Sequence, residues 1–261
     1  MSVYSDLQIF YEGWTGEKGY IGTTENGVLI PYFAVKKSEY PIVIAQYAIH
    51  AREFITTYLA FMQAEEFNKS GSKGSVYFIP AVNIDGIEEA ENFNGTYKAN
   101  ARRVDLNVNF DARWGKGAKN AFIRGDENFV GERPFSESET RALRDFTLKT
   151  MPDATISYHS KGEEIYWEFF QDKRARSRDY LIAKEISFLT GYPLKSAGRS
   201  VGGYKDWCIE KLGISSFTIE VGSDNLTHPI KKEHACEIFL KNKRVINAVT
   251  EILWKEKNGL C

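Results

Sequence analysis

The sequence is short of cysteine, of net charge and of long apolar runs, and each shortage excludes a class of protein. Its three cysteines, Cys208, Cys236 and Cys261, are far apart and form no CxxC pair, which argues against a disulfide framework and a thiolate zinc site. The net charge of −1 provides no overall field for binding nucleic acid or an anionic membrane. No apolar run approaches the roughly 18 residues that a membrane-spanning helix needs. We therefore expect neither a nucleic-acid nor a membrane partner.

The chain also lacks internal repeats, low-complexity stretches and linkers rich in Pro or Ser. Its 261 residues are enough for one large α/β domain, so we expect a single domain over residues 1–261. The first residues, MSVYSDLQIFYEG, have neither the basic start nor the long apolar stretch of a secretory signal, and the expected location is the cytoplasm. The sequence does not indicate an oligomeric state.

Apolar runs rich in β-branched residues recur along the chain, at 41–49, 75–82, 154–159 and 215–221. Because these runs are apolar on both faces, they predict strands that are buried under helices. Helical patterns alternate with them, at 52–68, 136–149, 178–190 and 231–256. Ser136 and Glu139 have the spacing of a capping box, and Gly191 follows the third helix as a C-cap. This alternation predicts an α/β fold with helices on both faces of one sheet.

Polar side chains stand at the ends of three of these runs. His50 follows the first run, His159 ends the third and Glu220 lies near the end of the last. A lone histidine at a strand end is more often structural. Here, however, two of only four histidines and a glutamate share this position. Ligands collect beyond the carboxyl ends of strands in such sheets, so a site is expected there.

Glu53 adds a further candidate ligand because it follows His50 by three residues and falls in the first turn of a helix. Catalytic zinc is held by three nitrogen or carboxylate ligands and keeps one position open for water. His50, Glu53 and His159 would supply such a set. The metal would polarise a carbonyl and activate water. Glu220 would then carry the proton to the leaving nitrogen. The alternative for Glu220 is an ion pair with a basic neighbour.

These residues lie in segments that resemble the zinc carboxypeptidases of the carboxypeptidase A type. The segments occur in the family's order and cover residues 40 to 222: HARE (50–53), IPAVNIDG (79–86), VDLNVNF (104–110), PFSESETRAL (134–143), ISYHS (156–160), GGYKDW (202–207) and SFTIE (216–220). The resemblance implies a mixed sheet of about eight strands between helices. It also implies a metallopeptidase with one Zn²⁺ per chain, in which activated water attacks an amide carbonyl.

The resemblance also implies roles for single residues. His50, Glu53 and His159 become the zinc ligands and Glu220 the general base. A cation that stabilises the oxyanion is expected shortly before the DLN motif, where Lys98 and Arg102 compete. Lys98 has the better spacing. Arg102 offers a forked donor and is slightly favoured.

The substrate-binding positions both match the family and depart from it. Arg52 is the arginine of the zinc motif, and Asn107 can offer an amide N–H. Val108 stands where digestive members have the arginine that holds the substrate's terminal carboxylate. Tyr204 is a candidate replacement for the tyrosine that closes over substrate. Lys205, at the floor of the specificity pocket, favours an anionic group on the substrate side chain.

The leading hypothesis is a peptidase that hydrolyses the γ-D-glutamyl-diaminopimelate bond of soluble muropeptides. The stretch KANARRVDLN, followed by a residue other than Arg, resembles the bacterial γ-D-glutamyl-diamino acid peptidases. A carboxypeptidase that removes acidic C-terminal residues is the second hypothesis, and the loss of arginine at Val108 argues against it. A catalytically inactive muropeptide-binding protein is the third.

Overall fold

The computed structural model describes residues 2–196 and 198–260. In this part of the chain, one mixed sheet holds eight strands in the order β1-β2-β4-β3-β5-β8-β6-β7. The strands are β1 (Lys18–Thr23), β2 (Leu29–Lys36), β3 (Ile42–Tyr47), β4 (Ser75–Ile79), β5 (Ala154–Ser160), β6 (Glu164–Tyr166), β7 (Leu194–Lys195) and β8 (Ser215–Val221). The expected mixed sheet of about eight strands is confirmed.

The four apolar runs of the sequence form the centre of this sheet. They become β4, β3, β5 and β8, which are neighbours and run parallel. Antiparallel pairs, β1 with β2, β2 with β4, and β6 with β8, extend the sheet on both sides. The carboxyl ends of β3, β5 and β8 therefore meet at one edge of the sheet.

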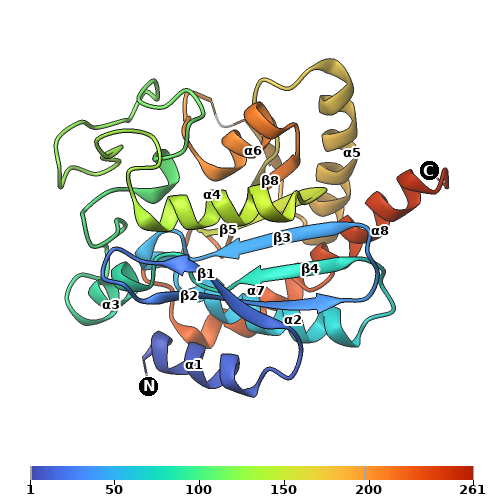
Figure 1. Cartoon of the computed structure of the whole chain (residues 1–261), viewed down its shortest axis with the longest axis horizontal. Coiled ribbons are helices and arrows are strands. Elements are labelled where there is room, and N and C mark those ends of the chain that lie inside the picture. The colour runs from blue at the N-terminus through green and yellow to red at the C-terminus, as the bar shows by residue number, and fades with distance from the viewer. Residues whose placement is uncertain (1, 197, 261) are drawn as a thin grey trace.

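Helices cover both faces of the sheet, as expected. They are α1 (Val3–Gly13), α2 (Ile55–Lys69), α3 (Ile84–Asn92), α4 (Ser138–Thr150), α5 (Lys173–Thr190), α6 (Tyr204–Leu212), α7 (Ala235–Asn242) and α8 (Val245–Lys257). Figure 1 shows α4 on one side of the strands and α1, α2 and α7 on the other. Each face has its own apolar core, and the sheet lies between the two cores.

Strand alternation decides which residues reach the site. Ile156 and Tyr158 of β5, together with Phe217 and Ile219 of β8, belong to the core that includes α2. Successive side chains of a strand point to opposite faces. The side chains between them in sequence, ending with His159 and Glu220, therefore point to the face that carries α4 and α6.

Several helix boundaries differ from the sequence expectations. The helix expected to begin at residue 52 begins at Ile55, and the helix expected to begin at residue 178 begins at Lys173. The predicted capping box is wrong, because α4 begins at Ser138 and the Ser136 hydroxyl donates to Glu137 Oε1 at 2.6 Å. The single helix expected over 231–256 is also wrong. This stretch forms a short 3₁₀ turn, η3 (Lys232–His234), followed by α7 and α8. The helix end at Gly191 is confirmed, with φ of 76° at this glycine.

Two further expectations concern cysteines and membranes. Cys208 and Cys236 are free thiols, and Cys261 lies outside the described residues. Among residues 2–196 and 198–260, no helix has the length and apolar character that crossing a bilayer requires.

Candidate metal centre

Three segments bring the candidate ligands together at the carboxyl edge of the parallel strands. His50 lies three residues beyond the end of β3, immediately before the 3₁₀ turn η1 (Ala51–Glu53) that carries Glu53. His159 is the sixth residue of β5. All three side chains are buried. The turn η1 folds Glu53 back over the strand end, so that ligands from positions 50, 53 and 159 meet.

The ligand atoms lie close together. His50 Nδ1 is 2.8 Å from Glu53 Oε1, and His159 Nδ1 is 2.9 Å from Glu53 Oε2. The two Nδ1 atoms are 3.1 Å apart. Ligand atoms that share one tetrahedral zinc at its usual bond lengths would be about 3.3 Å apart. The observed separations are close to that value, and the three residues form a group that could hold a metal ion.

Charge in this cluster favours a cation. Burial alone would raise the pKa of Glu53, but His50 and His159 outweigh it and hold this pKa well below its usual range. Burial alone would lower the pKa of His50, and Glu53 and Asp105 raise it instead. A buried carboxylate that remains ionised beside two imidazoles is the donor chemistry that zinc prefers. The residues present therefore fit the metal.

Asp105 fixes the orientation of His50 through the ring nitrogen Nε2, while Nδ1 faces Glu53. Asp105 Oδ1 lies 3.1 Å from His50 Nε2, and Asp105 Oδ2 lies 2.7 Å from Lys98 Nζ. A carboxylate on the far nitrogen of a metal-binding histidine sets its tautomer and raises its basicity. Asp105 is not among the site residues expected from the sequence. The position of this acid at the start of the DLN motif, two residues before Asn107, could have suggested one.

Glu220 lies beside the cluster on the neighbouring strand. It is in register with His159 in the parallel pair of β5 and β8. Burial raises the pKa of Glu220 to about 7, with Glu53 adding to the effect and His159 opposing it. A carboxyl group with a pKa near neutrality can accept and return a proton. The alternative of an ion pair with a basic neighbour has no support, because no salt bridge joins Glu220 to a cation in the part of the chain that the structure describes.

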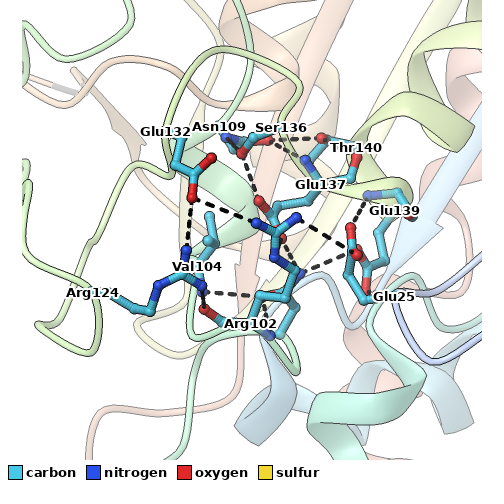
Figure 2. A network of polar contacts seen from close by, with 12 residues as sticks. Glu25, Arg102, Val104, Asn109, Arg124, Glu132, Ser136, Glu137, Glu139 and Thr140 are labelled. Atoms are coloured by element: carbon cyan, nitrogen blue, oxygen red, sulfur yellow. Dashed lines mark hydrogen bonds and ion pairs between the residues drawn. The ribbon is translucent and has the colours of Figure 1, made fainter.

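The two candidate cations for the oxyanion lie in different places. Lys98 is largely buried beside Asp105, and its Nζ also donates to Asn128 Oδ1 at 3.0 Å. Figure 2 shows that Arg102 instead lies among carboxylates, with ion-pair distances of 3.8 Å to Glu25 and 3.7 Å to Glu132. The preference for Arg102 is thus not supported, and Lys98 is the cation beside the ligand cluster.

A cavity of about 220 Å³ opens next to Glu220, and its lining includes Asn107, Tyr166, Lys205 and Asp206. Lys205 is buried, but it is not a bare positive charge, because its Nζ donates to Asp206 Oδ1 at 2.6 Å. Asp206 Oδ2 also accepts from the Gly203 backbone N–H at 3.2 Å, at the start of α6. The expected cation is in the cavity, with a carboxylate of this chain beside it.

Tyr204 does not occupy the position expected for it. Its side chain is fully buried, its hydroxyl is 2.8 Å from Thr147 Oγ1, and its ring packs near Phe110 and Trp207. A ring held in this core cannot close over a substrate. Asn107 does line the cavity, with its side-chain oxygen accepting from the Tyr204 backbone N–H at 3.2 Å. Val108 is buried.

A family model described as zinc carboxypeptidase matches residues 17–255. The chain therefore belongs to the zinc carboxypeptidase family, whose cofactor is Zn²⁺. The group formed by His50, Glu53 and His159 is where the structure could hold it.

The proteins similar to this chain include a bacterial endopeptidase and two solved structures. The gamma-D-glutamyl-L-diamino acid endopeptidase 1 of Lysinibacillus sphaericus is 30% identical over 236 residues, covering 74% of this chain and 59% of that protein. A solved structure of bovine thrombin-activatable fibrinolysis inhibitor has a TM-score of 0.86 at 21% identity, covering 98% of each chain. The murein-tripeptide amidase MpaA of Escherichia coli O157 has a TM-score of 0.65 at 21% identity, covering 91% of this chain and 95% of that one. The chain spans 59% to 62% of the length of the endopeptidase and of two further curated relatives.

Proposed function

We propose that this protein is a zinc metallopeptidase that hydrolyses the γ-D-glutamyl-diaminopimelate bond of muropeptides. The observation that carries the proposal is the meeting of His50, Glu53 and His159 within ligand distance, with Glu220 on the adjacent strand. The endopeptidase relative supports the bond type, since its name specifies a γ-D-glutamyl-diamino acid linkage.

Different residues of the chain would hold the metal, transfer the proton and stabilise the developing charge during amide hydrolysis. His50, Glu53 and His159 would hold the zinc, which when bound polarises the scissile carbonyl and activates water. Glu220 takes the proton from the attacking water and returns it to the leaving nitrogen. Lys98 lies near enough to oppose the negative charge that develops on the carbonyl oxygen. Asp105 holds both His50 and Lys98 in place.

The cavity beside Glu220 suits a side chain that ends in both an ammonium and a carboxylate group. Lys205 and Asp206 present opposite charges that are already paired at 2.6 Å. A lone carboxylate entering this cavity would meet Asp206 as well as Lys205, whereas a paired ammonium and carboxylate would keep the charges alternating. The far end of diaminopimelate carries these two groups. Lysine and glutamate carry only one of them.

The second candidate is a carboxypeptidase that removes acidic C-terminal residues. The curated relatives include carboxypeptidase B2 of Bos taurus, 28% identical over 262 residues, and Lys205 supplies a cation in the cavity. Two observations favour the first candidate. Val108 offers no charge to a terminal carboxylate, and the Lys205–Asp206 pair leaves no uncompensated charge for a glutamate side chain.

The test combines metal analysis with a defined substrate panel. We expect one zinc per chain and cleavage of L-Ala-γ-D-Glu-meso-diaminopimelate, detected by mass spectrometry. A peptide ending in an α-linked glutamate should remain intact, and cleavage of this peptide alone would favour the carboxypeptidase. Stoichiometric zinc without cleavage of any peptide in the panel would favour the inactive muropeptide-binding protein.

A variant tests the cavity. Lys205→Met should raise KM for the diaminopimelate substrate by about 10-fold or more, because a charge-assisted contact is lost and Asp206 is left unpaired. The KM for the corresponding lysine substrate should change less. Lys211→Met, which removes an exposed lysine of the same helix, is the matched control. An equal effect of Lys205→Met on both substrates would show that Lys205 does not contact the substrate carboxylate.

A further inference from the structure

Most cations around the metal ligands already have a carboxylate partner. Lys98 pairs with Asp105 at 2.7 Å, and Lys205 pairs with Asp206 at 2.6 Å. Arg52, between His50 and Glu53 in sequence, differs from them. No carboxylate in the described ranges 2–196 and 198–260 forms an ion pair with its guanidinium group. Its Nη1 donates to the Thr96 carbonyl at 3.3 Å.

The Nε atom of Arg52 is buried and lacks a hydrogen-bond partner among the residues that the structure describes. An arginine is charged at all relevant pH values, and its N–H groups form a rigid fork that matches a carboxylate. A buried donor on a charged group without a partner is costly, so such a position is expected to receive one from a ligand. The free positive charge of the site thus lies at Arg52 and not at Lys205.

A second polar atom without a partner, a ring nitrogen, lies in the same neighbourhood. His228 Nδ1 is buried and likewise has no hydrogen-bond partner in the described part of the chain. The charges of Glu53, Arg52 and Lys161 all act on the His228 ring. The chain path agrees with this placement. A Cβ built at Gly95 would lie 2.8 Å from Pro229 Cδ, so the residues next to His228 and Thr96 are in contact.

We propose that Arg52, assisted by His228, binds the free α-carboxylate of the γ-linked glutamyl residue on the acyl side of the scissile bond. This inference rests on the proposed function. The proposed function places diaminopimelate, the residue on the leaving side of the bond, in the cavity that holds Lys205. Arg52 lines a different cleft, of about 850 Å³, which also includes Lys98 and Asp105 and shares no lining residue with that cavity. The acyl part of the substrate is thereby assigned to the cleft with Arg52.

The chemistry of the γ-glutamyl linkage explains why the acyl side of the site would need a group that binds a carboxylate. A γ-glutamyl bond uses the side-chain carboxyl group of glutamate, so the α-carboxylate stays free within a few bonds of the scissile carbonyl. An α-linked peptide has no such group at that position. The remaining walls of the cleft carry acidic side chains, among them Glu88, Asp126 and Glu127. These acids repel an anion over much of the cleft, so a carboxylate is favoured only near its cations, of which Lys98 is already paired with Asp105 and Arg103 is exposed to solvent.

The experiment compares two substrates that differ only in this carboxylate. One is L-Ala-γ-D-Glu-meso-diaminopimelate, and the other has the glutamyl α-carboxylate converted to the amide. The zinc-loaded enzyme should show a kcat/KM about 30-fold higher for the acid, the range expected of a charge-assisted hydrogen bond. Arg52→Gln should reduce this preference to about 3-fold or less by lowering kcat/KM for the acid alone.

Three further variants sharpen the comparison. Arg52→Lys keeps the charge but loses the fork, so an intermediate preference for the acid is expected. His228→Ala should lower the preference about 5-fold, in keeping with one lost hydrogen bond. Arg103→Gln removes the same charge from an exposed position in the same cleft and should preserve the preference. Each variant is first checked for one zinc per chain, because Arg52 adjoins Glu53. If Arg52→Gln loses zinc, Arg52→Lys and His228→Ala decide the question.

The outcomes separate this inference from the function on which it rests. Cleavage of the acid and the amide at equal rates by the unmodified enzyme would overturn the carboxylate site and leave the proposed function intact. Equal losses on both substrates in Arg52→Gln would also overturn it, because Arg52 would then act on the zinc ligands or the fold. Failure to cleave either substrate would overturn the proposed function and this inference together.

Discussion

Among residues 2–196 and 198–260, two clusters have the spacing of a metal site, and they differ in charge balance. His50, Glu53 and His159 form one, and Glu25, Glu137 and Glu139 form the other. Ligand atoms lie within 4.8 Å of one another in both. The first cluster offers two imidazole nitrogens for one carboxylate. The second consists of carboxylates alone.

The carboxylate cluster already contains its own positive charge. Arg102 lies 3.8 Å from Glu25 and 3.9 Å from Glu137, and Figure 2 shows its guanidinium group between them. Burial raises the pKa of Glu139 to about 7, although a hydrogen bond from Asn100 opposes the shift. Arg102 therefore offsets part of the negative charge of this cluster, and the raised pKa of Glu139 offsets more of it. Spacing alone does not define a metal site, and the cations nearby must be counted as well.

The largest effect should follow from removing a ligand of the first cluster. His159→Ala deletes one of three ligands, so we expect zinc content far below one per chain and no detectable hydrolysis. Metal analysis after dialysis provides the measurement. Glu137→Gln, the matched change in the second cluster, should leave the zinc content at one per chain. Loss of zinc from both variants would show that the two clusters are not distinct in function.

Glu220→Gln should lower kcat by about 10³-fold while zinc stays bound, because the proton carrier is lost and the ligands remain. Single-turnover kinetics with the diaminopimelate tripeptide, alongside metal analysis, would measure both properties. A kcat within a few-fold of the unmodified enzyme would mean that another group carries the proton.

Two variants, Lys98→Met and Arg102→Met, test which cation assists catalysis and which one stabilises the fold. We expect Lys98→Met to lower kcat by about 10²-fold, since a donor near the developing oxyanion disappears. Arg102→Met should change kcat little, but it should lower the free energy of unfolding by about 1–2 kcal/mol, because the carboxylates Glu25 and Glu137 lose their counter-ion. Urea denaturation measures the second effect. A larger loss of kcat in Arg102→Met than in Lys98→Met would restore the preference drawn from the sequence.

The smallest effect concerns Glu139 and pH. Its folded-state pKa of about 7 lies above the ordinary value of 4.5, so the folded protein binds the extra proton and loses stability as pH rises through this interval. Glu139→Gln cannot lose that proton. At pH 8 it should be more stable than the unmodified protein by on the order of 2 kcal/mol, with little difference at pH 5. Thermal unfolding at both pH values, with the exposed Glu65→Gln as control, would detect it.

The sheet and the ligand cluster could be predicted from sequence for physical reasons. Parallel strands that are buried on both faces read as long apolar runs, and all four runs became the central strands. A polar side chain at the carboxyl end of such a run lies at the edge of the sheet where the neighbouring parallel strands also end. His50, His159 and Glu220 therefore had to share one edge of the sheet.

The expectations that the structure does not support concern residues whose positions depend on contacts with distant segments. Nothing in the sequence of 231–256 marks a break, but the Asn242 carbonyl accepts from Gln63 Nε2 at 3.0 Å instead of continuing a helix. Lys98 and Arg102 are four residues apart in one loop, and the loop path depends on Asn100, whose side chain binds Glu137 Oε2 at 2.9 Å. The expectation for Tyr204 rests only on its position in a motif. Its burial against Thr147 is visible only in three dimensions.

The register of His159 with Glu220 has a consequence for how this enzyme could diversify. Neighbouring strands in a sheet are about 4.8 Å apart, and backbone hydrogen bonds hold that spacing. The distance between His159 and Glu220 is therefore fixed by the backbone pairing of two central strands. Arg52 and His228, by contrast, sit on turns and loops outside the strands. Substitutions at these two positions, and insertions in the loop that holds His228, could redirect the enzyme to new peptides while the strand spacing is kept.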